Sequence, residues 1–442
     1  MKIYALVDCD SFFASCEKVF RPDWAEKPIV VLSNNDGCVI ARSVEAKPLV
    51  AMGTPWFRIK SLAKQLGLVV CSSNHVLYGD MSRRVMETLG QWSYDVEVYS
   101  IDEAFLDLTR RYQRDLEEGK PIGRSLATLG REITETVPRW TGIPVSVGIG
   151  PNKTLAKLAN RIAKDLPGRL FGVMNRAKRE KVLKAFPIAD LWGVGRKLLP
   201  RLERFGLKTA WDLSQLDPLV VRREFSVAQE RLVRELNGEV CYGEEPPEHK
   251  NIQITRSFGK TITEAAELEK AFASFAVRGA RRLRHLGLKA SAVSVSIATN
   301  LFRPELPQHS PVSVVGFYRP TDDTVEILKG ILPVLRTIYK AGYAYKRGGI
   351  TLMDLVPADV ALSQESLFGE TPDFESPLGT DQSSRQKRAE LYRAVDRVNE
   401  IGGRTKIFFA AEGTDRVWIP SSEFVSPCWT TDMDRLPVVK AE

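Results

Sequence analysis

Acidic residues follow two short apolar segments that lie far apart in the sequence. Asp8 ends an alternating segment that begins at Ile3, and Asp102 and Glu103 end a second one that begins at Val96. Alternation with a period of two predicts β-strands, so each acid stands at a strand end. If the two strands are neighbours, the three carboxylates repel one another unless a divalent cation lies between them. The sequence therefore predicts a magnesium site.

Such a site has a specific use in phosphorus chemistry. Two magnesium ions about 3.5–4 Å apart stabilise the attacking and leaving oxygens of an in-line displacement. We expect Asp8 and Asp102 to bind or bridge the ions and Glu103 to hold the ion that activates the attacking hydroxyl. The backbone carbonyl of Cys9 would complete the other ion's shell. We assign Asp10 to the start of a helix, where an acid caps backbone N–H groups.

Composition excludes several classes of protein. The six cysteines form no C-x-x-C pair, and the four histidines do not cluster with them. Zinc and a disulfide framework are therefore not expected, and we predict a reducing, cytoplasmic location. No window approaches ~18 uninterrupted apolar residues and no signal peptide is evident, so no membrane partner is expected. The 442 residues exceed what one core usually supports, which predicts two to four domains.

Charge is unevenly distributed along the chain. Residues 246–356 hold 16 basic and 9 acidic side chains, whereas residues 357–442 hold 10 basic and 15 acidic ones, within a net charge of +8. A basic surplus concentrated in one module favours nucleic-acid binding. The alternative is that the basic side chains only form solvated surface, which the net charge alone would favour.

The pattern of elements predicts a multidomain protein that combines α/β and α+β parts. An α/β domain at 1–25 and 75–167 is interrupted by a small insertion at 26–74, and a helical segment follows at 168–240. Residues 246–356 read as βαββαβ. Residues 357–386 have a linker composition. A tail at 387–442 ends the chain, with a helix near 385–400 and a strand-like segment at 406–410.

Two features of these modules predict contact with DNA. Gly193 and Gly195 lie in a turn before a helix, and Arg196 and Lys197 follow them, with a second helix expected from 205. A glycine turn between helices lets backbone N–H groups approach a phosphate, as in a helix-hairpin-helix; a plain helical connection is the alternative. In the basic module, the arginines of the first helix also suit phosphates, although they could serve only solubility: Arg278, Arg281, Arg282 and Arg284.

The two acidic segments resemble the catalytic signatures of Y-family translesion DNA polymerases. Asp8 is followed by two aromatic residues, and the sequence from Ser100 to Phe105 reads Ser-Ile-Asp-Glu-Ala-Phe. The resemblance covers most of the chain. It implies a right-hand polymerase with palm, small fingers, helical thumb and βαββαβ little finger, in the order of the modules above, plus a C-terminal tail.

Finer marks resemble the UmuC-like branch, the catalytic subunits of bacterial DNA polymerase V. They are the segments 33–42, 256–259, which opens with Arg256, and 402–405. The resemblance implies error-prone, template-directed DNA synthesis past damaged bases in the SOS response. Its substrates would be primer-template DNA and a dNTP, with two Mg²⁺ ions.

The resemblance also implies roles for residues around the nucleotide. Phe12 and Phe13 would bind the dNTP, and Phe13 would be the steric gate beneath the incoming sugar; a core aromatic is the alternative for Phe13. Lys164 would bind the triphosphate. In the fingers, where many relatives bind the triphosphate with Tyr and Arg, this chain has Val44 and Lys47. Lys47 would bind the dNTP there, and Arg42 would compensate for the missing residues.

A linker pentapeptide resembles a sliding-clamp binding motif. From a flexible segment, Leu367 and Phe368 would insert into an apolar groove on the clamp, and Gln364 would form a hydrogen bond at its rim. The family would add a processed UmuD-like dimer and a RecA filament as partners of the acidic tail.

Three other readings remain open on the sequence. A DinB-like polymerase IV would share the catalytic residues but normally lacks this tail. A clamp-tethered DNA-binding protein would use the acids only structurally. A palm-type nucleotide cyclase would use similar carboxylates but leaves the helix-hairpin-helix and the basic module without a role.

Overall fold

The structure is a computed structural model that describes residues 2–119, 122–243, 250–359, 382–401, 406–415 and 418–431. The chain forms two compact units: Met1–Pro246 with Ser422–Glu442, and Pro247–Ser421. The clamp-like motif at 364–368 and the segment at 402–405 lie outside the described residues. No helix in the described ranges combines the length and apolarity needed to cross a membrane.

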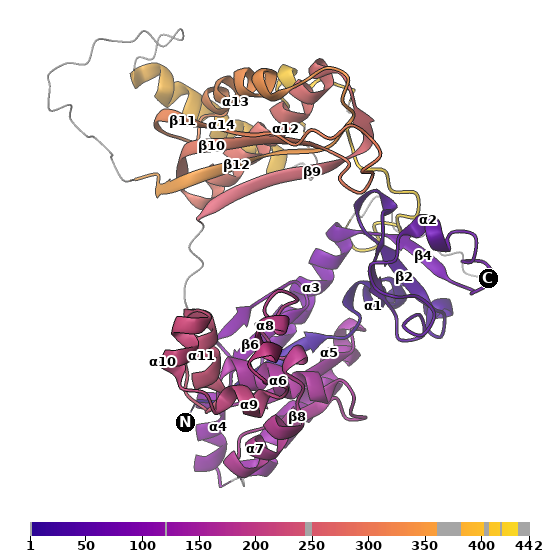
Figure 1. Ribbon diagram of the computed structural model, residues 1–442, viewed down its shortest axis with the longest axis vertical. Coiled ribbons are helices and arrows are strands. Elements are labelled where there is room, and N and C mark those ends of the chain that lie inside the picture. Colours follow the sequence, from indigo (N-terminus) through magenta and orange to yellow (C-terminus); the bar gives the residue numbers. More distant parts are fainter. Residues whose placement is uncertain are drawn as a thin grey trace, which may run out of the picture. The chain divides into compact units, whose positions relative to one another are not determined.

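The first unit is built on a five-stranded sheet of order β5-β6-β1-β7-β8 (Figure 1). Strand β1 pairs antiparallel with both β6 and β7, and Asp8 lies directly opposite Glu103. The two acid-bearing strands are therefore neighbours, as predicted. Residues 99–102 form the turn of a hairpin rather than the end of the first strand. The strands are β1 (Tyr4–Cys9), β5 (Val96–Val98), β6 (Glu103–Asp107), β7 (Val145–Gly150) and β8 (Leu170–Gly172).

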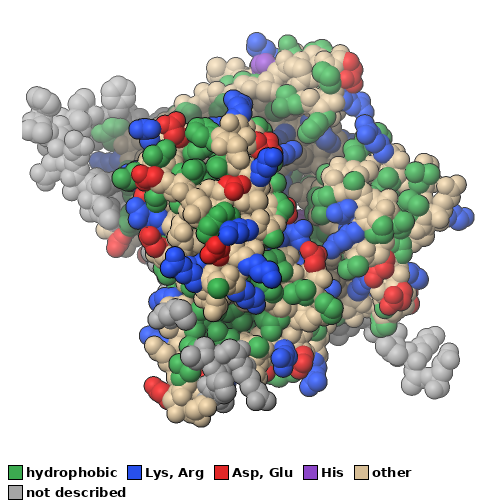
Figure 2. All heavy atoms as spheres, turned by 60° about the horizontal axis from the view of Figure 1, so that its bottom comes forward, with side chains coloured by type: hydrophobic (Ala, Val, Ile, Leu, Met, Phe, Trp, Pro, Cys, Tyr) green, Lys and Arg blue, Asp and Glu red, His purple; other side chains and the backbone are tan. Residues whose placement is uncertain are grey.

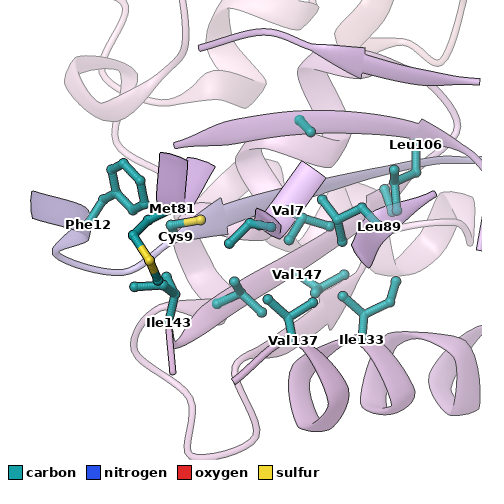
Figure 3. Packing of buried hydrophobic residues seen from close by; sticks show 14 of the residues in the cluster. Val7, Cys9, Phe12, Met81, Leu89, Leu106, Ile133, Val137, Ile143 and Val147 are labelled. Atoms are coloured by element: carbon teal, nitrogen blue, oxygen red, sulfur yellow. The ribbon is translucent and has the colours of Figure 1, made fainter. Parts of the chain in front are cut away.

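Alternation along β1 divides its side chains between two layers. Ala5, Val7 and Cys9 pack in the large core with residues of α3 (His75–Leu89) and α5 (Ile122–Thr141). Figure 3 shows Val7 and Cys9 in one cluster with Met81 of α3 and with Ile133 and Val137 of α5. Tyr4 and Leu6 instead cluster with Ala156 of α6 (Lys153–Ala163). Asp8 continues the second series, so its side chain faces the α6 side of the sheet.

Helix α6 comes very close to the sheet at Gly148. A Cβ atom at this position would lie 2.0 Å from the backbone nitrogen of Asn160 and 2.3 Å from the carbonyl oxygen of Ala156. Only glycine permits this approach without moving backbone. The approach matters because α6 and the residue that caps its C-terminus carry the two lysines that pair with Asp8 and Glu103.

The insertion forms a three-stranded sheet of order β3-β2-β4. Its strands are β2 (Ile29–Leu32), β3 (Val39–Arg42) and β4 (Val69–Ser72), with the 3₁₀ turns η1 (Pro22–Trp24) and η2 (Asn34–Asp36) and the short helix α2 (Trp56–Ile59) around them. Helix α1 (Phe12–Val19) connects β1 to this part.

Short helices follow the sheet and share a core around Leu202 and Leu213. The second helix of the predicted hairpin begins at Ala210, not near 205, because Gly206 takes a positive φ of 77° and Thr209 caps the new helix. The remaining helices of the unit are α4 (Thr109–Glu117), α7 (Arg176–Ala185), η3 (Ile188–Asp190), α8 (Leu199–Arg204), α9 (Ala210–Ser214), α10 (Pro218–Glu224) and α11 (Val227–Leu236).

The second unit has the predicted βαββαβ order. Its antiparallel sheet runs β11-β10-β12-β9, and Figure 1 shows helices α12 and α13 on one side of it. Phe258, Phe272 and Phe275 are buried in the core between them. The elements are β9 (Asn251–Ile262), α12 (Ala265–Leu286), β10 (Leu288–Thr299), β11 (Val312–Thr321), α13 (Thr324–Ile338) and β12 (Tyr345–Pro357).

The tail begins with helix α14 (Gln382–Ile401), close to its predicted place. Residues 406–410 do not form the predicted strand and lead into the 3₁₀ turn η4 (Ala410–Glu412). The side chain of Asn399 accepts hydrogen bonds from the backbone N–H groups of Lys406 and Ile407. These donors are therefore satisfied by a helix side chain instead of a neighbouring strand.

We predict that Gly148→Ala lowers the free energy of unfolding by about 2–3 kcal/mol, because the new methyl group must push α6 off the sheet. Chemical denaturation of both variants measures this. Gly168→Ala is the matched control, since a Cβ there meets no heavy atom within 4 Å, and its stability should stay within about 0.5 kcal/mol of wild type. Equal stabilities of the two variants would contradict the close approach.

Candidate active site

The three predicted catalytic acids stand together at one edge of the first sheet. Asp8 and Glu103 are register partners on β1 and β6. The N–H of Cys9 donates to the carbonyl of Asp102 at 2.8 Å, which fixes the hairpin turn against β1. The thiol of Cys9 is buried in the core, so of its polar groups the backbone carbonyl is the one suited to bind a metal.

Two lysines, Lys157 of α6 and Lys164, which caps the C-terminus of that helix, reach these acids. Lys164 Nζ lies 2.7 Å from Asp8 Oδ1, and Lys157 Nζ lies 3.0 Å from Glu103. Lys157 also lies 4.5 Å from the ring centroid of Tyr99 and 5.2 Å from that of Trp192. Sequence reasoning found Lys164 and missed Lys157. The signal was available, since residues seven apart lie on one face of a helix.

Burial makes Asp8 an unusual carboxylate. Its side chain is 10% exposed, and this burial raises the pKa of Asp8 to about 7. The ammonium group of Lys164 opposes the rise, while the negative charges of Glu103 and Asp102 add to it. A second cation near Asp8 would therefore favour its ionised form.

The donor set fits a hard divalent cation in its chemistry. Carboxylates and a backbone carbonyl are the oxygen ligands that magnesium prefers. Among the described residues, no three acidic, histidine or cysteine side chains lie close enough to hold a metal as they stand. Asp8 and Glu103 each form an ion pair with a lysine, and the Ser100 hydroxyl donates to Asp102 at 2.6 Å. Metal binding therefore requires these partners to be exchanged.

The assignment of Asp10 to helix capping is wrong. Both carboxylate oxygens of Asp10 accept from the Ser146 hydroxyl, and Arg169 donates to one of them at 2.7 Å. Helix α1 has no side-chain cap at Ser11. Strand alternation, which puts Asp10 on the same side as Asp8, predicted its position correctly.

The two aromatic residues after the first acids differ in their surroundings. The Phe12 ring is buried in the core, so of the groups of Phe12 the backbone is the one that can reach a nucleotide. The Phe13 ring is half-buried and stacks on Tyr78 at 4.4 Å. Ser11, the residue before α1, has a left-handed backbone, and its buried hydroxyl has no hydrogen-bond partner among the described residues. An unsatisfied hydroxyl at an uncapped helix start suits a ligand oxygen.

In the fingers, the two predicted nucleotide contacts are also unequal. Arg42 donates to the carbonyl of Val50 at 2.7 Å, which occupies part of its guanidinium within the unit. Lys47 is exposed. The structure does not bring either residue into contact with Asp8 or Lys164.

The glycine turn before α8 is open to solvent. Gly193 takes a positive φ of 89°, and Gly195, Arg196 and Lys197 are exposed. Their backbone and charges are therefore accessible to a phosphate.

Two predicted DNA contacts in the second unit pair with acids of α14, one of them at the surface. Arg284 makes a bidentate pair with Asp396 of α14, at 2.7 and 3.1 Å, and its side chain is 13% exposed. Arg281 lies 3.5 Å from Glu400 of the same helix. The assignment of Arg284 is corrected, because Asp396 occupies its guanidinium. The side chain of Arg281 is 37% exposed, so its contact with DNA stays a prediction. Arg282 stays exposed, and the half-buried Arg256 of β9 donates to the carbonyl of Thr255.

On the face shown in Figure 2, charge does not single out one binding site. Figure 2 shows lysine and arginine side chains at many places on the visible face, interspersed with acidic ones. Sites must therefore be argued from particular contacts.

Comparison with known protein families matches most of these parts. Residues 7–161 match the impB/mucB/samB family, and residues 249–367 match the C-terminal domain of that family. Residues 389–439 match a domain of unknown function.

Individual relatives agree with these matches. The chain is 39% identical to Protein UmuC of Salmonella typhimurium, over 99% of this chain and 100% of that protein. It is 28% identical to DNA polymerase IV of Caulobacter vibrioides, over 81% of this chain and 84% of that protein. A solved Y-family DNA polymerase chimera, Dbh-Dpo4(243-245)-Dbh, has a similar fold, with a TM-score of 0.62 over 80% of this chain and 99% of its own, at 22% identity. The predicted right-hand fold is thereby confirmed.

We predict that Asp8→Asn changes the pH dependence of stability in metal-free protein. Asp8 ionises near pH 4 in the unfolded chain and near 7 in the folded one, so wild-type protein loses stability as pH rises between these values. The variant lacks this loss, which amounts to roughly 1.4 kcal/mol per pKa unit at most. Urea unfolding at about pH 5 and pH 8 measures it. An unchanged difference between wild type and variant at the two pH values would contradict the assignment.

Proposed function

This chain belongs to the impB/mucB/samB family, the UmuC-like branch of the Y-family DNA polymerases, and on that premise we propose how its site performs error-prone, translesion DNA synthesis. It is a DNA-directed DNA polymerase. The reaction is attack of a primer 3′-hydroxyl on the α-phosphorus of a dNTP, which forms a phosphodiester and releases pyrophosphate. A relative of full length at 39% identity supports the UmuC-like branch over the DinB-like alternative.

One observation carries the catalytic assignment. Asp8, Asp102 and Glu103 come from two hydrogen-bonded strands and stand at adjacent positions of one sheet edge. Acids used only structurally, as in a non-catalytic DNA-binding protein, do not require such crowding at a sheet edge. The carboxylates therefore favour phosphoryl chemistry.

Magnesium fits these residues as the cofactor. Two Mg²⁺ ions would be held by Asp8, Asp102 and Glu103 with the carbonyl of Cys9, and they would stabilise charge on the attacking and leaving oxygens. We infer that Lys164 neutralises Asp8 before the cations arrive, since its ammonium lies 2.7 Å from the carboxylate. Once released, Lys164 is free to bind the triphosphate.

The start of α1 supplies the next nucleotide contacts. The first-turn N–H groups of an uncapped helix point at an anion, and its dipole favours negative charge there. Phe12 would contribute its N–H to the triphosphate, while the Phe13 ring would lie beneath the sugar and exclude a 2′-hydroxyl. Arg42 and Lys47 would assist from the fingers.

Further partners follow from the family and from charge. Gly193, Gly195, Arg196 and Lys197 would contact the DNA backbone, with Arg256 and Arg282 from the second unit. Gln364, Leu367 and Phe368 would bind a sliding clamp. A UmuD-like processed dimer and a RecA filament would act with the chain in the cytoplasm during the SOS response.

We predict that Asp102→Asn reduces primer extension by about 10²- to 10³-fold or more, because it removes a carboxylate that faces the reacting phosphate. Binding to primer-template DNA should change little. Single-nucleotide extension kinetics and a DNA-binding titration measure the two effects. Asp165→Asn is the control, since Asp165 is exposed and pairs only at the surface with Arg161. Extension retained by the Asp102 variant would exclude this site.

A further inference from the structure

Residues 422–431 pack on the first unit, and we name them the C-terminal clasp. The N–H of Ser72 donates to the carbonyl of Phe424, and the N–H of Phe424 donates to the Ser72 hydroxyl, both at 2.9 Å. These bonds place the clasp along the end of strand β4. It lies within the domain of unknown function.

Aromatic contacts hold the clasp at both of its ends. The Phe424 ring meets Trp56 edge-on at 5.5 Å, and the Trp429 ring stacks on Phe20 at 5.3 Å. Such contacts bury large apolar area and fix geometry. The clasp is therefore packed against the first unit through aromatic side chains at both of its ends.

The clasp also holds the first turns of helix α3. The Asn74 side chain, which caps α3, donates to the Ser426 hydroxyl at 3.0 Å. The Thr430 hydroxyl donates to Asp80 at 2.8 Å. Because α3 begins between these two contacts, the clasp fixes the position of the helix that carries Tyr78.

One clasp residue reaches a buried carboxylate. Ser426 Oγ donates to Glu17 Oε1 at 3.1 Å, and the Tyr78 hydroxyl donates to the same oxygen at 2.8 Å. Glu17 is 1% exposed, and its other oxygen has no hydrogen-bond partner among the described residues. Burial raises the pKa of Glu17, and the two hydroxyl donors oppose that rise. A buried carboxylate with so few donors depends on each of them.

The same network ends at the proposed sugar gate. Glu17 lies one turn after Phe13 on α1, so both belong to one face of the helix. The Tyr78 ring stacks on the Phe13 ring with centroids 4.4 Å apart and planes 15° apart. His75 meets both rings edge-on, at 5.9 and 6.0 Å. The position of Phe13 therefore depends on Tyr78 and Glu17.

We propose that the C-terminal clasp positions the sugar gate, with Ser426 acting through Glu17 and Tyr78 on Phe13. This inference rests on the proposed role of Phe13 in excluding ribonucleotides. Steric discrimination by a ring is sensitive to small displacements, as misplacement by 1 Å can change a rate by about 10²-fold. The clasp is thus a determinant of sugar specificity supplied from the far end of the chain, and Ser426 is a positioning residue.

The test compares ribonucleotide and deoxyribonucleotide incorporation by the full chain. We measure kcat/KM for single-nucleotide primer extension with each and take their ratio. Ser426→Ala should raise the ribonucleotide-to-deoxyribonucleotide ratio about threefold to tenfold, with a change of less than about twofold for the dNTP itself. Ser426→Thr, which keeps the hydroxyl, should restore the wild-type ratio. The exposed Ser422→Ala is the matched control and should leave the ratio unchanged.

Two further variants separate this inference from the proposed function. Phe13→Ala should raise the ratio more than Ser426→Ala, and the double variant should match Phe13→Ala alone, because Ser426 acts through the ring. No rise in Phe13→Ala would refute the gate itself. Two results would overturn the clasp's role. One is a raised ratio in Phe13→Ala with an unchanged ratio in Ser426→Ala. The other is that Ser426→Ala raises the ratio by the same factor in wild type and in Phe13→Ala. If Ser426→Ala does not fold, Tyr78→Phe, which keeps the stack and removes the hydroxyl, should raise the ratio in its place.

Discussion

The ion pair between Asp8 and Lys164 is the interaction on which the rest of the active site depends. A carboxylate buried at a sheet edge is costly unless a cation accompanies it, and two further acids beside it increase that cost. The fold meets the requirement with Lys157 of helix α6, which reaches Glu103, and with Lys164 at the C-terminal cap of that helix, which reaches Asp8. That in turn requires the helix to lie close against β7, which only glycine at position 148 allows. The pairing of the buried carboxylates with lysines therefore depends on the close packing of α6 against the sheet.

Distant segments satisfy other buried acids of the same unit. Asp10 is held by Ser146 and Arg169, and Asp36 accepts from Ser72 and from the backbone of Glu423. The bond from the backbone of Glu423 to Asp36, like the bond from Ser426 to Glu17, comes from the C-terminal part of the chain. The chain leaves the first unit after Pro246 and returns at Ser422, so the second unit is connected to the first at both of its ends. The described tail residues from Ser422 onward are thus part of the first unit.

The sequence predicted the features that depend on local pattern. Strand alternation up to Asp8 and the βαββαβ order both follow from periodicity and were confirmed. The errors share another cause, which is that the partner of a charged or polar group lies far away in sequence. Arg284 looks like an exposed phosphate ligand until Asp396 is seen beside it, and residues 406–410 look like a strand until Asn399 is seen to satisfy their N–H groups. The prediction for Asp10 was wrong because a helix cap was preferred to the position that strand alternation indicates. The contact of Ser426 with Glu17 spans 409 positions and no local pattern indicates it.

The central claim is that Lys164 and a divalent cation compete for Asp8. The most direct measurement is the Mg²⁺ affinity of the chain without DNA or nucleotide, determined by calorimetry near pH 8.5 for wild type and for Lys164→Met. If the ammonium must leave Asp8 before the metal binds, the variant will bind Mg²⁺ more tightly than wild type, by about tenfold if the pair contributes roughly 1.4 kcal/mol. Equal or weaker binding by the variant would contradict the account.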